Sequence, residues 1–152
     1  MKKILLIGLL AIALFGYLDK NVQTTQIVQN VFAADTVASD SASNSALQNA
    51  IDNRQSKVQV AGSGDVIKVL SDDLKGSRHQ RFILKIASGC TLLVAHNIDL
   101  ASRIDGLNVG DNVEFYGVYE FNNKGGVIHW THHDPRGKHQ GGWLKHNGNV
   151  YQ

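Results

Sequence analysis

Cysteine, proline and aromatic residues are scarce in this sequence. The 152-residue chain contains one cysteine and one proline, and aromatic residues make up 7% of it. A single cysteine excludes a disulfide within the chain and leaves Cys90 as a free thiol. We interpret Cys90 as a small buried strand residue rather than a nucleophile, because free cysteine usually packs as a small apolar side chain. The one proline, Pro135, is expected to stop the last strand, since proline cannot donate a ladder hydrogen bond.

An excess of charge of one sign is also absent. The 15 lysines and arginines are balanced by 13 aspartates and glutamates, which gives a formal net charge of +2 with neutral histidines. Nucleic-acid-binding domains typically carry a strong basic excess. Charge alone therefore does not indicate a nucleic-acid-binding protein, although protonated histidines would make the C-terminal region locally basic.

The sequence has no apolar run as long as a typical transmembrane helix, which needs roughly 20 residues. Its longest run, residues 4–18, follows Lys2 and Lys3 and is typical of a secretory signal. A small-residue cleavage site lies only near Ala33, far from the run, so residues 1–33 are either a signal peptide or an uncleaved N-terminal anchor. We expect an exported protein, periplasmic or extracellular, with tethering to the inner membrane left open. No transmembrane domain is expected beyond this segment.

The remainder divides into a linker and one domain. Residues 34–46 are mostly serine, alanine, aspartate and asparagine, which predicts a flexible linker. Leu47, Ala50 and Ile51 fall at helical spacing and predict a short helix over residues 47–54 at the start of a domain that spans 47–152. Strand patterns fill residues 58–134, and we interpret residues 135–152 as a His- and Gly-rich C-terminal tail.

Alternating apolar and polar residues predict a mainly β domain. The expected strands cover residues 58–70, 80–86, 90–96, 113–121 and 127–133. Gly62 and Gly64 predict a bend in the first strand and Gly117 a bend in the fourth, while the apolar third strand is expected to be buried on both faces. Residues 100–107 are expected to form a short helix or an irregular crossover. This order predicts a small five-stranded OB-like barrel, with a small open sandwich as the alternative.

Five of the seven histidines and both tryptophans lie in the segment Gly125–His146. Three interpretations stay open: a metal site, a metal-free acid/base or anion site, and a solvated strand without chemistry. As a strand, the segment places His129 and His133 on one face about 13 Å apart, too far for both to bind one ion. A metal site would need other partners, and Zn²⁺ is the ion that neutral imidazoles suit. The candidate metal ligands are His132, His133, His139 and Asp134.

Polar residues gather at the ends of the second and third predicted strands. His79 and Arg81 open the second strand, and His96 and Asn97 close the third. If the two strands form a hairpin, these residues lie at the same end of the sheet. The candidate ligand-binding residues are His79, Arg81, His96, Asn97, His129 and Trp130.

Four motifs carry a family resemblance: "GSRHQRFIL", "LLVAHNIDLA", "GDNVEFYGVYEFN" and "GGVIHWTHHDP". With them the chain resembles, over residues 58–152, a bacterial family known only as domain of unknown function 3465 (DUF3465). The resemblance implies an OB-type domain in an exported protein and supplies no reaction or substrate. Cys90 and Ser102 depart from the family pattern, which argues further against chemistry at Cys90.

Our leading hypothesis is an exported OB-like module that binds an anionic or carbohydrate polymer through the His- and Arg-rich patch. The alternative from another class is a metal-dependent or His-dependent phosphodiesterase or nuclease, with His132, His133 and Arg81 as candidate catalytic residues. The paired carboxylates of an ordinary glycosidase are missing, which makes glycoside cleavage the weaker enzymatic option. A third hypothesis is a structural envelope protein without a ligand.

Overall fold

The computed structural model describes residues 45–152, which belong to one compact unit. The predicted signal or anchor, residues 1–33, and the predicted linker up to residue 44 lie outside the described residues. Within the described part, no helix is both long enough and apolar enough to cross a membrane.

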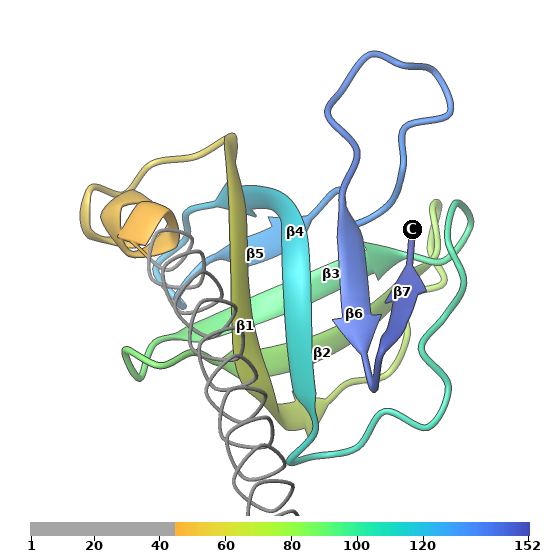
Figure 1. Ribbon diagram of the computed structural model, residues 1–152, viewed down its shortest axis with the longest axis horizontal. Helices are drawn as coiled ribbons and strands as arrows, with labels where there is room; N and C mark the ends of the chain where they lie inside the picture. Colours follow the sequence, from red (N-terminus) through yellow and green to blue (C-terminus); the bar gives the residue numbers. More distant parts are fainter. Residues whose placement is uncertain (1–44) are drawn as a thin grey trace, which may run out of the picture. The chain divides into compact units, whose positions relative to one another are not determined.

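Five strands close into a barrel, as Figure 1 shows. They are β1 (Val58–Val69), β2 (His79–Lys85), β3 (Thr91–Asn97), β4 (Asn112–Glu120) and β5 (Val127–His129). β1, β2 and β3 pair antiparallel in sequence order, and β5 lies parallel to β3. β4 pairs with β5 on one edge and with β1 on the other, which closes the barrel. This strand order confirms the predicted five-stranded OB-like barrel.

β1 is long enough to serve two neighbours, as its glycine-interrupted sequence predicts. Its residues 58–65 pair with β4, and its residues 65–69 pair with β2. A Cβ at Gly64 would lie 2.8 Å from the carbonyl oxygen of Lys85, so glycine permits the close approach where β1 passes from one neighbour to the other. A register shift between Val66 and Lys68 adds a bulge at the same bend.

The barrel interior is filled by the apolar side chains of alternating strand positions. Phe82, Leu84 and Phe115 are fully buried, as the patterns of β2 and β4 predict. The short helix, residues 45–52, covers one end of this core with Leu47 and Ala50, which are 1% and 0% exposed. The predicted helix is confirmed, and it ends at residue 52, about two residues earlier than predicted.

The connection between β3 and β4 is an irregular crossover held by buried polar side chains. The amide nitrogen of Gln80 donates to the Ile104 carbonyl, and the Ile104 N–H donates back to the amide oxygen, both at 2.9 Å. The ring of His96 lies 3.1 Å from the carbonyl oxygen of Ser102 on the same crossover. Gln80 and His96 are both 0% exposed, and their side chains attach the crossover to the barrel. These bonds satisfy two polar side chains that would otherwise be buried without partners.

The C-terminal region departs from the sequence-based prediction. Residues 143–152 do not form a tail, because β6 (Trp143–His146) pairs with β4 and β7 (Asn149–Tyr151) pairs with β6. The predicted strand 127–133 is also wrong, since β5 ends at His129. Trp130 has the left-handed backbone conformation, with φ of 54°, and leaves the sheet.

β5 and β6 occupy successive places along one edge of β4. Val118 of β4 pairs with His129 of β5, and Tyr116 pairs with Trp143 of β6. A Cβ at Gly142 would collide with the carbonyl oxygens of Trp130 and Tyr116, so the chain can rejoin this edge there only through glycine. Residues 130–142 are therefore a loop inserted into one interrupted strand, and Figure 1 shows it projecting from the barrel.

Candidate functional site

A groove runs over the outer surface of β2, β3 and β5. It consists of two adjoining hollows of about 280 Å³ and 380 Å³, which share His79, Ala95 and His129. The strand register brings the lining residues of the two hollows side by side, because His79 pairs with Asn97 and Arg81 pairs with Ala95 across the β2–β3 hairpin. The predicted hairpin is confirmed, and it places these polar groups at one end of the sheet.

Outward-facing apolar residues of β3 form the floor of the groove. Leu93 and Ala95 are half-buried and line it, whereas Leu92 and Val94 point into the core. The expectation that both faces of β3 are buried is therefore wrong, since the apolar residues on its second face line an open groove. Small and apolar side chains here leave room for a ligand to lie across the sheet.

The structure brings together most of the predicted site residues and separates the others. Those that line the groove are His79, Arg81, Asn97, His129, Trp130 and His132. His96 does not, because the inward positions of β3 carry it into the core, where it is 0% exposed. His133 is exposed and lies outside both hollows, and His139 and Asp134 belong to the inserted loop.

His96 is a structural histidine. Since a carbonyl only accepts, the ring Nε2–H donates to Ser102, and Nδ1 accepts from the Thr131 hydroxyl at 2.8 Å. Burial lowers the pKa of His96 to about 4, which keeps the ring neutral and consistent with this pattern. Its effect on the groove is indirect, since Thr131 follows Trp130 in the chain.

His129 occupies the centre of the groove with one nitrogen unpaired. Its Nε2 is buried and has no hydrogen-bond partner, and the nearest carboxylate oxygen, on Glu120, is 3.8 Å away. Burial lowers the pKa of His129, so the ring favours its neutral form. An unpaired buried nitrogen costs free energy, and a small movement of the His129 ring or of Glu120 is needed before a ligand, a water or the carboxylate can bond to it.

His132 lines the smaller hollow, and one of its ring nitrogens is engaged by the backbone. The ring is 4% exposed, and its Nδ1–H donates to the carbonyl of His133 at 2.7 Å. In the neutral ring this bond fixes the tautomer and leaves Nε2 as an acceptor. No residue within 45–152 hydrogen-bonds to that nitrogen.

Trp130 forms the wall between the groove and the inserted loop. Its ring lines the smaller hollow, with the His132 ring centroid at 5.5 Å and the His139 centroid at 4.3 Å. The left-handed backbone of Trp130 turns the indole out of the sheet, because the strand ends one residue earlier. Trp130 is therefore a half-exposed aromatic surface rather than a core residue.

The charges of the groove are mixed. Arg81 lines the larger hollow, and its Nε and Nη2 donate to the Ser71 carbonyl at 3.1 and 3.0 Å. Asp73 and Glu120 line the same hollow, so the fixed charges are one cation against two anions. Sequence reasoning missed both carboxylates as site residues. The alternation of β4 placed Glu120 on the outer face, but only the pairing of β4 with β5 places it beside His129.

The predicted metal ligands do not converge. Asp134 accepts backbone N–H groups of its own loop, His139 lies on Trp130, and His133 faces solvent. Across residues 45–152, no group of three or more His, Cys, Asp and Glu side chains is arranged to hold a metal ion. The zinc interpretation therefore loses its geometric basis in the described part of the chain. Cys90 is half-buried against the core, away from the groove.

Comparison with known proteins identifies the family and nothing more specific. Residues 26–152 match the family described as "Protein of unknown function (DUF3465)". The chain belongs to this family. The match extends the DUF3465 region beyond the motifs of residues 58–152 to include the helix at 45–52. No curated protein and no solved structure matches the chain.

Proposed function

We propose that this DUF3465 protein is a binding module whose groove over β2, β3 and β5 holds a stretch of glycan. The observation that carries the proposal is the composition of the groove. A half-exposed indole, imidazoles, an amide and charges of both signs line a shallow apolar floor. Sugar rings offer apolar C–H faces and many hydroxyl groups, so they match an aromatic wall next to mixed donors and acceptors. The corresponding face of OB-type barrels is a frequent site for oligosaccharides and oligonucleotides.

The mixed charge favours a glycan over a nucleic acid. Binding of single-stranded nucleic acid combines stacking with a positively charged path for the phosphates. Here Asp73 and Glu120 outnumber Arg81 among the fixed charges of the groove. A phosphate backbone lying across this floor would meet two carboxylates, whereas a sugar hydroxyl can donate to either of them.

Filling the groove tests the proposal. The full-length chain is titrated with a panel of soluble glycans that includes peptidoglycan fragments, and with single-stranded DNA. Ala95→Phe places a ring where the two hollows meet and should weaken glycan binding about tenfold or more, a loss of about 1.4 kcal/mol. Ala61→Phe is the matched control, because Ala61 is also a half-buried outward position but lies on β1 opposite Tyr116.

Three results would overturn the glycan proposal: no glycan in the panel binds, DNA binds instead with a steep salt dependence, or both phenylalanine variants bind alike. In the first case, with no turnover in the assay below, the envelope protein without a ligand becomes the better hypothesis.

A second candidate is His-dependent hydrolysis of a phosphodiester, and the fixed tautomer of His132 favours it. His132, whose Nε2 is the accepting nitrogen of the neutral ring, lines the same hollow as His79 and His129. A neutral imidazole that accepts a proton and a protonated imidazole that donates one form the usual general base and acid pair. Arg81 would stabilise the developing charge on phosphate. This activity needs no metal, in keeping with the scattered metal-ligand candidates.

Turnover of bis(p-nitrophenyl) phosphate and of single-stranded RNA, with chelator present, tests this candidate. His132→Gln should abolish it, while His133→Gln, at an exposed position outside the groove, should leave it unchanged. The hydrolase candidate is lost if neither substrate turns over or if both variants behave alike.

We further propose that the module acts outside the cytoplasm, on the strength of the basic and apolar pattern of residues 1–33. Fusing these residues to alkaline phosphatase, which is active only after export, would test it. An inactive fusion would contradict the proposed location.

A further inference from the structure

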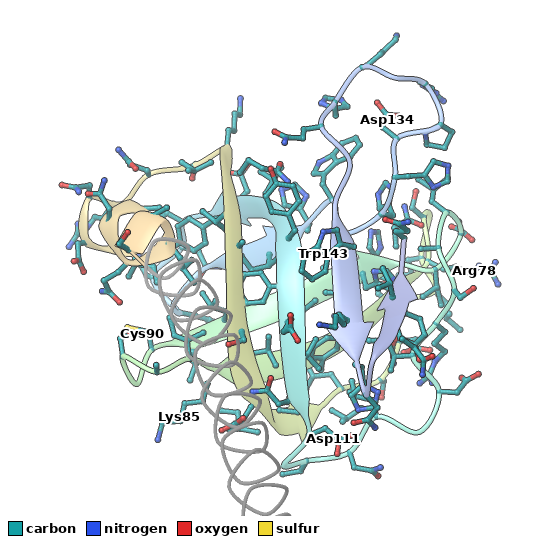
Figure 2. The ribbon with its side chains drawn as sticks, in the orientation of Figure 1. Arg78, Lys85, Cys90, Asp111, Asp134 and Trp143 are labelled. Atoms are coloured by element: carbon teal, nitrogen blue, oxygen red, sulfur yellow. The ribbon has the colours of Figure 1, made fainter. Side chains whose placement is uncertain are left out.

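The loop inserted between β5 and β6, residues 130–142, is held by hydrogen bonds within itself. Its base is closed by a hydrogen bond from the Gly142 N–H to the His132 carbonyl at 2.9 Å. Its far end turns at Gly137, which has a positive φ of 60°. Figure 2 shows Asp134 on this loop, at the opposite end of the molecule from Asp111 and Lys85.

The carboxylate of Asp134 organises the loop from within. It accepts the backbone N–H groups of Arg136, Lys138 and His139, with the Arg136 bond at 2.9 Å and the His139 bond at 2.7 Å. These bonds lower the pKa of Asp134, so the carboxylate stays ionised near neutral pH. The single negative charge of the loop is thus used to hold its backbone.

The two positive charges of the loop, on Arg136 and Lys138, are unpaired within residues 45–152. Arg136 and Lys138 are exposed, and neither forms an ion pair within residues 45–152. Several other basic residues of the barrel are paired, such as Arg78 with Asp99 and Lys145 with Glu114. The loop therefore presents two free cations on a braced backbone, together with the exposed imidazoles of His133 and His139.

The loop continues directly from the groove. His139 lies against Trp130 with ring centroids 4.3 Å apart, and Trp130 lines the smaller hollow. A polymer held on the groove floor and leaving over Trp130 would reach the cations next. Since the backbone that carries them is held in place before binding, only their side chains lose freedom when an anion is bound.

We propose that the loop of residues 130–142 recognises anionic substituents of the glycan, such as sulfate, phosphate or carboxylate groups, through Arg136 and Lys138. This inference rests on the proposed function and adds a preference for an acidic glycan. The sugar rings of the glycan contact the mixed groove, and its charged groups contact the basic loop. An anionic membrane fits the loop less well, because its exposed tip has no large apolar side chain to insert between lipids.

Matched probes test the loop in the full-length chain: dextran, dextran sulfate and phosphatidylglycerol vesicles. Dextran sulfate should bind at least about tenfold tighter than dextran. Arg136→Ala with Lys138→Ala should remove most of that preference. Lys68→Ala with Lys85→Ala removes the same charge from exposed positions on β1 and β2 and should leave the preference in place.

Asp134→Ala separates the shape of the loop from its charge. The substitution raises the net charge by one unit, so charge alone predicts tighter binding of dextran sulfate. Loss of the brace predicts weaker binding, by about threefold or more, because the cations must then be ordered on binding. Asp105→Ala adds the same charge at a side chain that is 91% exposed on the crossover and should not weaken binding. Thermal unfolding of each variant verifies that the barrel is intact.

The results separate this inference from the proposed function. Equal binding of the two dextrans, or unchanged binding in the Arg136 and Lys138 double variant, would overturn the role of the loop. Tighter binding by Asp134→Ala would overturn the role of Asp134 in ordering the two cations. Binding of vesicles in preference to dextran sulfate would assign the loop to a membrane and overturn it as well. If Ala95→Phe leaves all glycan binding intact while the loop variants weaken dextran sulfate, the groove proposal fails and the anion-binding loop stands.

Discussion

His96 and Thr131 meet inside the barrel at 2.8 Å, and the hydroxyl donates to the ring nitrogen. The pair joins the end of β3 to the first residues of the inserted loop, directly behind the groove. A protonated ring would have to donate from both nitrogens, which breaks this bond and places a charge in the core. The position of Trp130, one residue before Thr131, therefore depends on a histidine that stays neutral.

Acid should destabilise the protein through His96. Its pKa is about 4 in the folded chain against 6.5 for the free group, so the unfolded chain binds more protons between these values. Stability is therefore full above pH 6.5 and falls as the pH decreases toward 4. Between pH 7.5 and pH 5 the expected loss from this residue is about 2 kcal/mol in the free energy of unfolding. Urea unfolding at the two pH values measures it.

His96→Gln isolates this contribution. The variant keeps a donor for the Ser102 carbonyl and should be less stable at pH 7.5, but its stability should change less with pH than that of the wild type. His133→Gln, at an exposed position, should retain the wild-type pH dependence. An equally steep pH dependence in His96→Gln would show that other groups cause the acid sensitivity.

Gln80 should be among the polar residues that contribute most to stability. Gln80→Leu removes both hydrogen bonds to Ile104, which leaves the buried Ile104 N–H without a partner and the Ile104 carbonyl with only the 3.3 Å bond from Arg103 Nη1. We expect a loss of about 2 to 4 kcal/mol in chemical denaturation. Gln59→Leu provides the comparison, because the buried amide nitrogen of Gln59 has no partner to lose. A similar loss of stability in the two variants would contradict the importance of the two Gln80–Ile104 hydrogen bonds.

Gly142 should not tolerate even alanine. A Cβ at this position collides with two backbone carbonyls, which cannot move aside as a flexible side chain can. Gly142→Ala should destabilise the protein by about 2 kcal/mol or more and change the near-ultraviolet circular dichroism of Trp130 and Trp143. The adjacent Gly141→Ala should cost much less, because its Cβ would be no closer than 3.4 Å to any neighbour. Equal tolerance at both positions would contradict the account of how β6 rejoins β4.

The barrel could be predicted from the sequence because the alternation of apolar and polar residues shows which face of a strand is buried. The patterns of β2 and β4 placed Phe82, Phe115 and their neighbours inside. The strands after Pro135 were missed although a local signal was present. Asn147 and Gly148 both adopt positive φ between β6 and β7, and Asn-Gly is the dipeptide most typical of a tight hairpin.

The candidate site was less predictable because it depends on contacts between distant segments. Counting alternate residues along β3 from Leu92 would have placed His96 inside the barrel. The end of β5 at Trp130 could not be read locally, since β6 takes over the edge of β4 only through the close approach at Gly142. The meeting of His129 with Glu120 likewise follows from strand register, which the sequence does not specify on its own.

His146 and Asp111 should be energetically coupled, since they join β6 to the end of the crossover. The His146 Nε2–H donates to the Asp111 carboxylate at 2.9 Å, and the two side chains are 5% and 27% exposed. The Asn108 N–H and His146 together lower the pKa of Asp111. A double-mutant cycle with His146→Ala and Asp111→Ala measures the coupling energy between the two side chains. The Lys145–Glu114 pair lies next to it, between β6 and β4, and is a suitable comparison, because its side chains are 40% and 46% exposed. Solvent screens that pair, so the coupling between His146 and Asp111 should be at least twice as large and should persist in 1 M NaCl. Equal coupling energies, or loss of both at high salt, would show that the His146–Asp111 contact does not hold the crossover against the sheet.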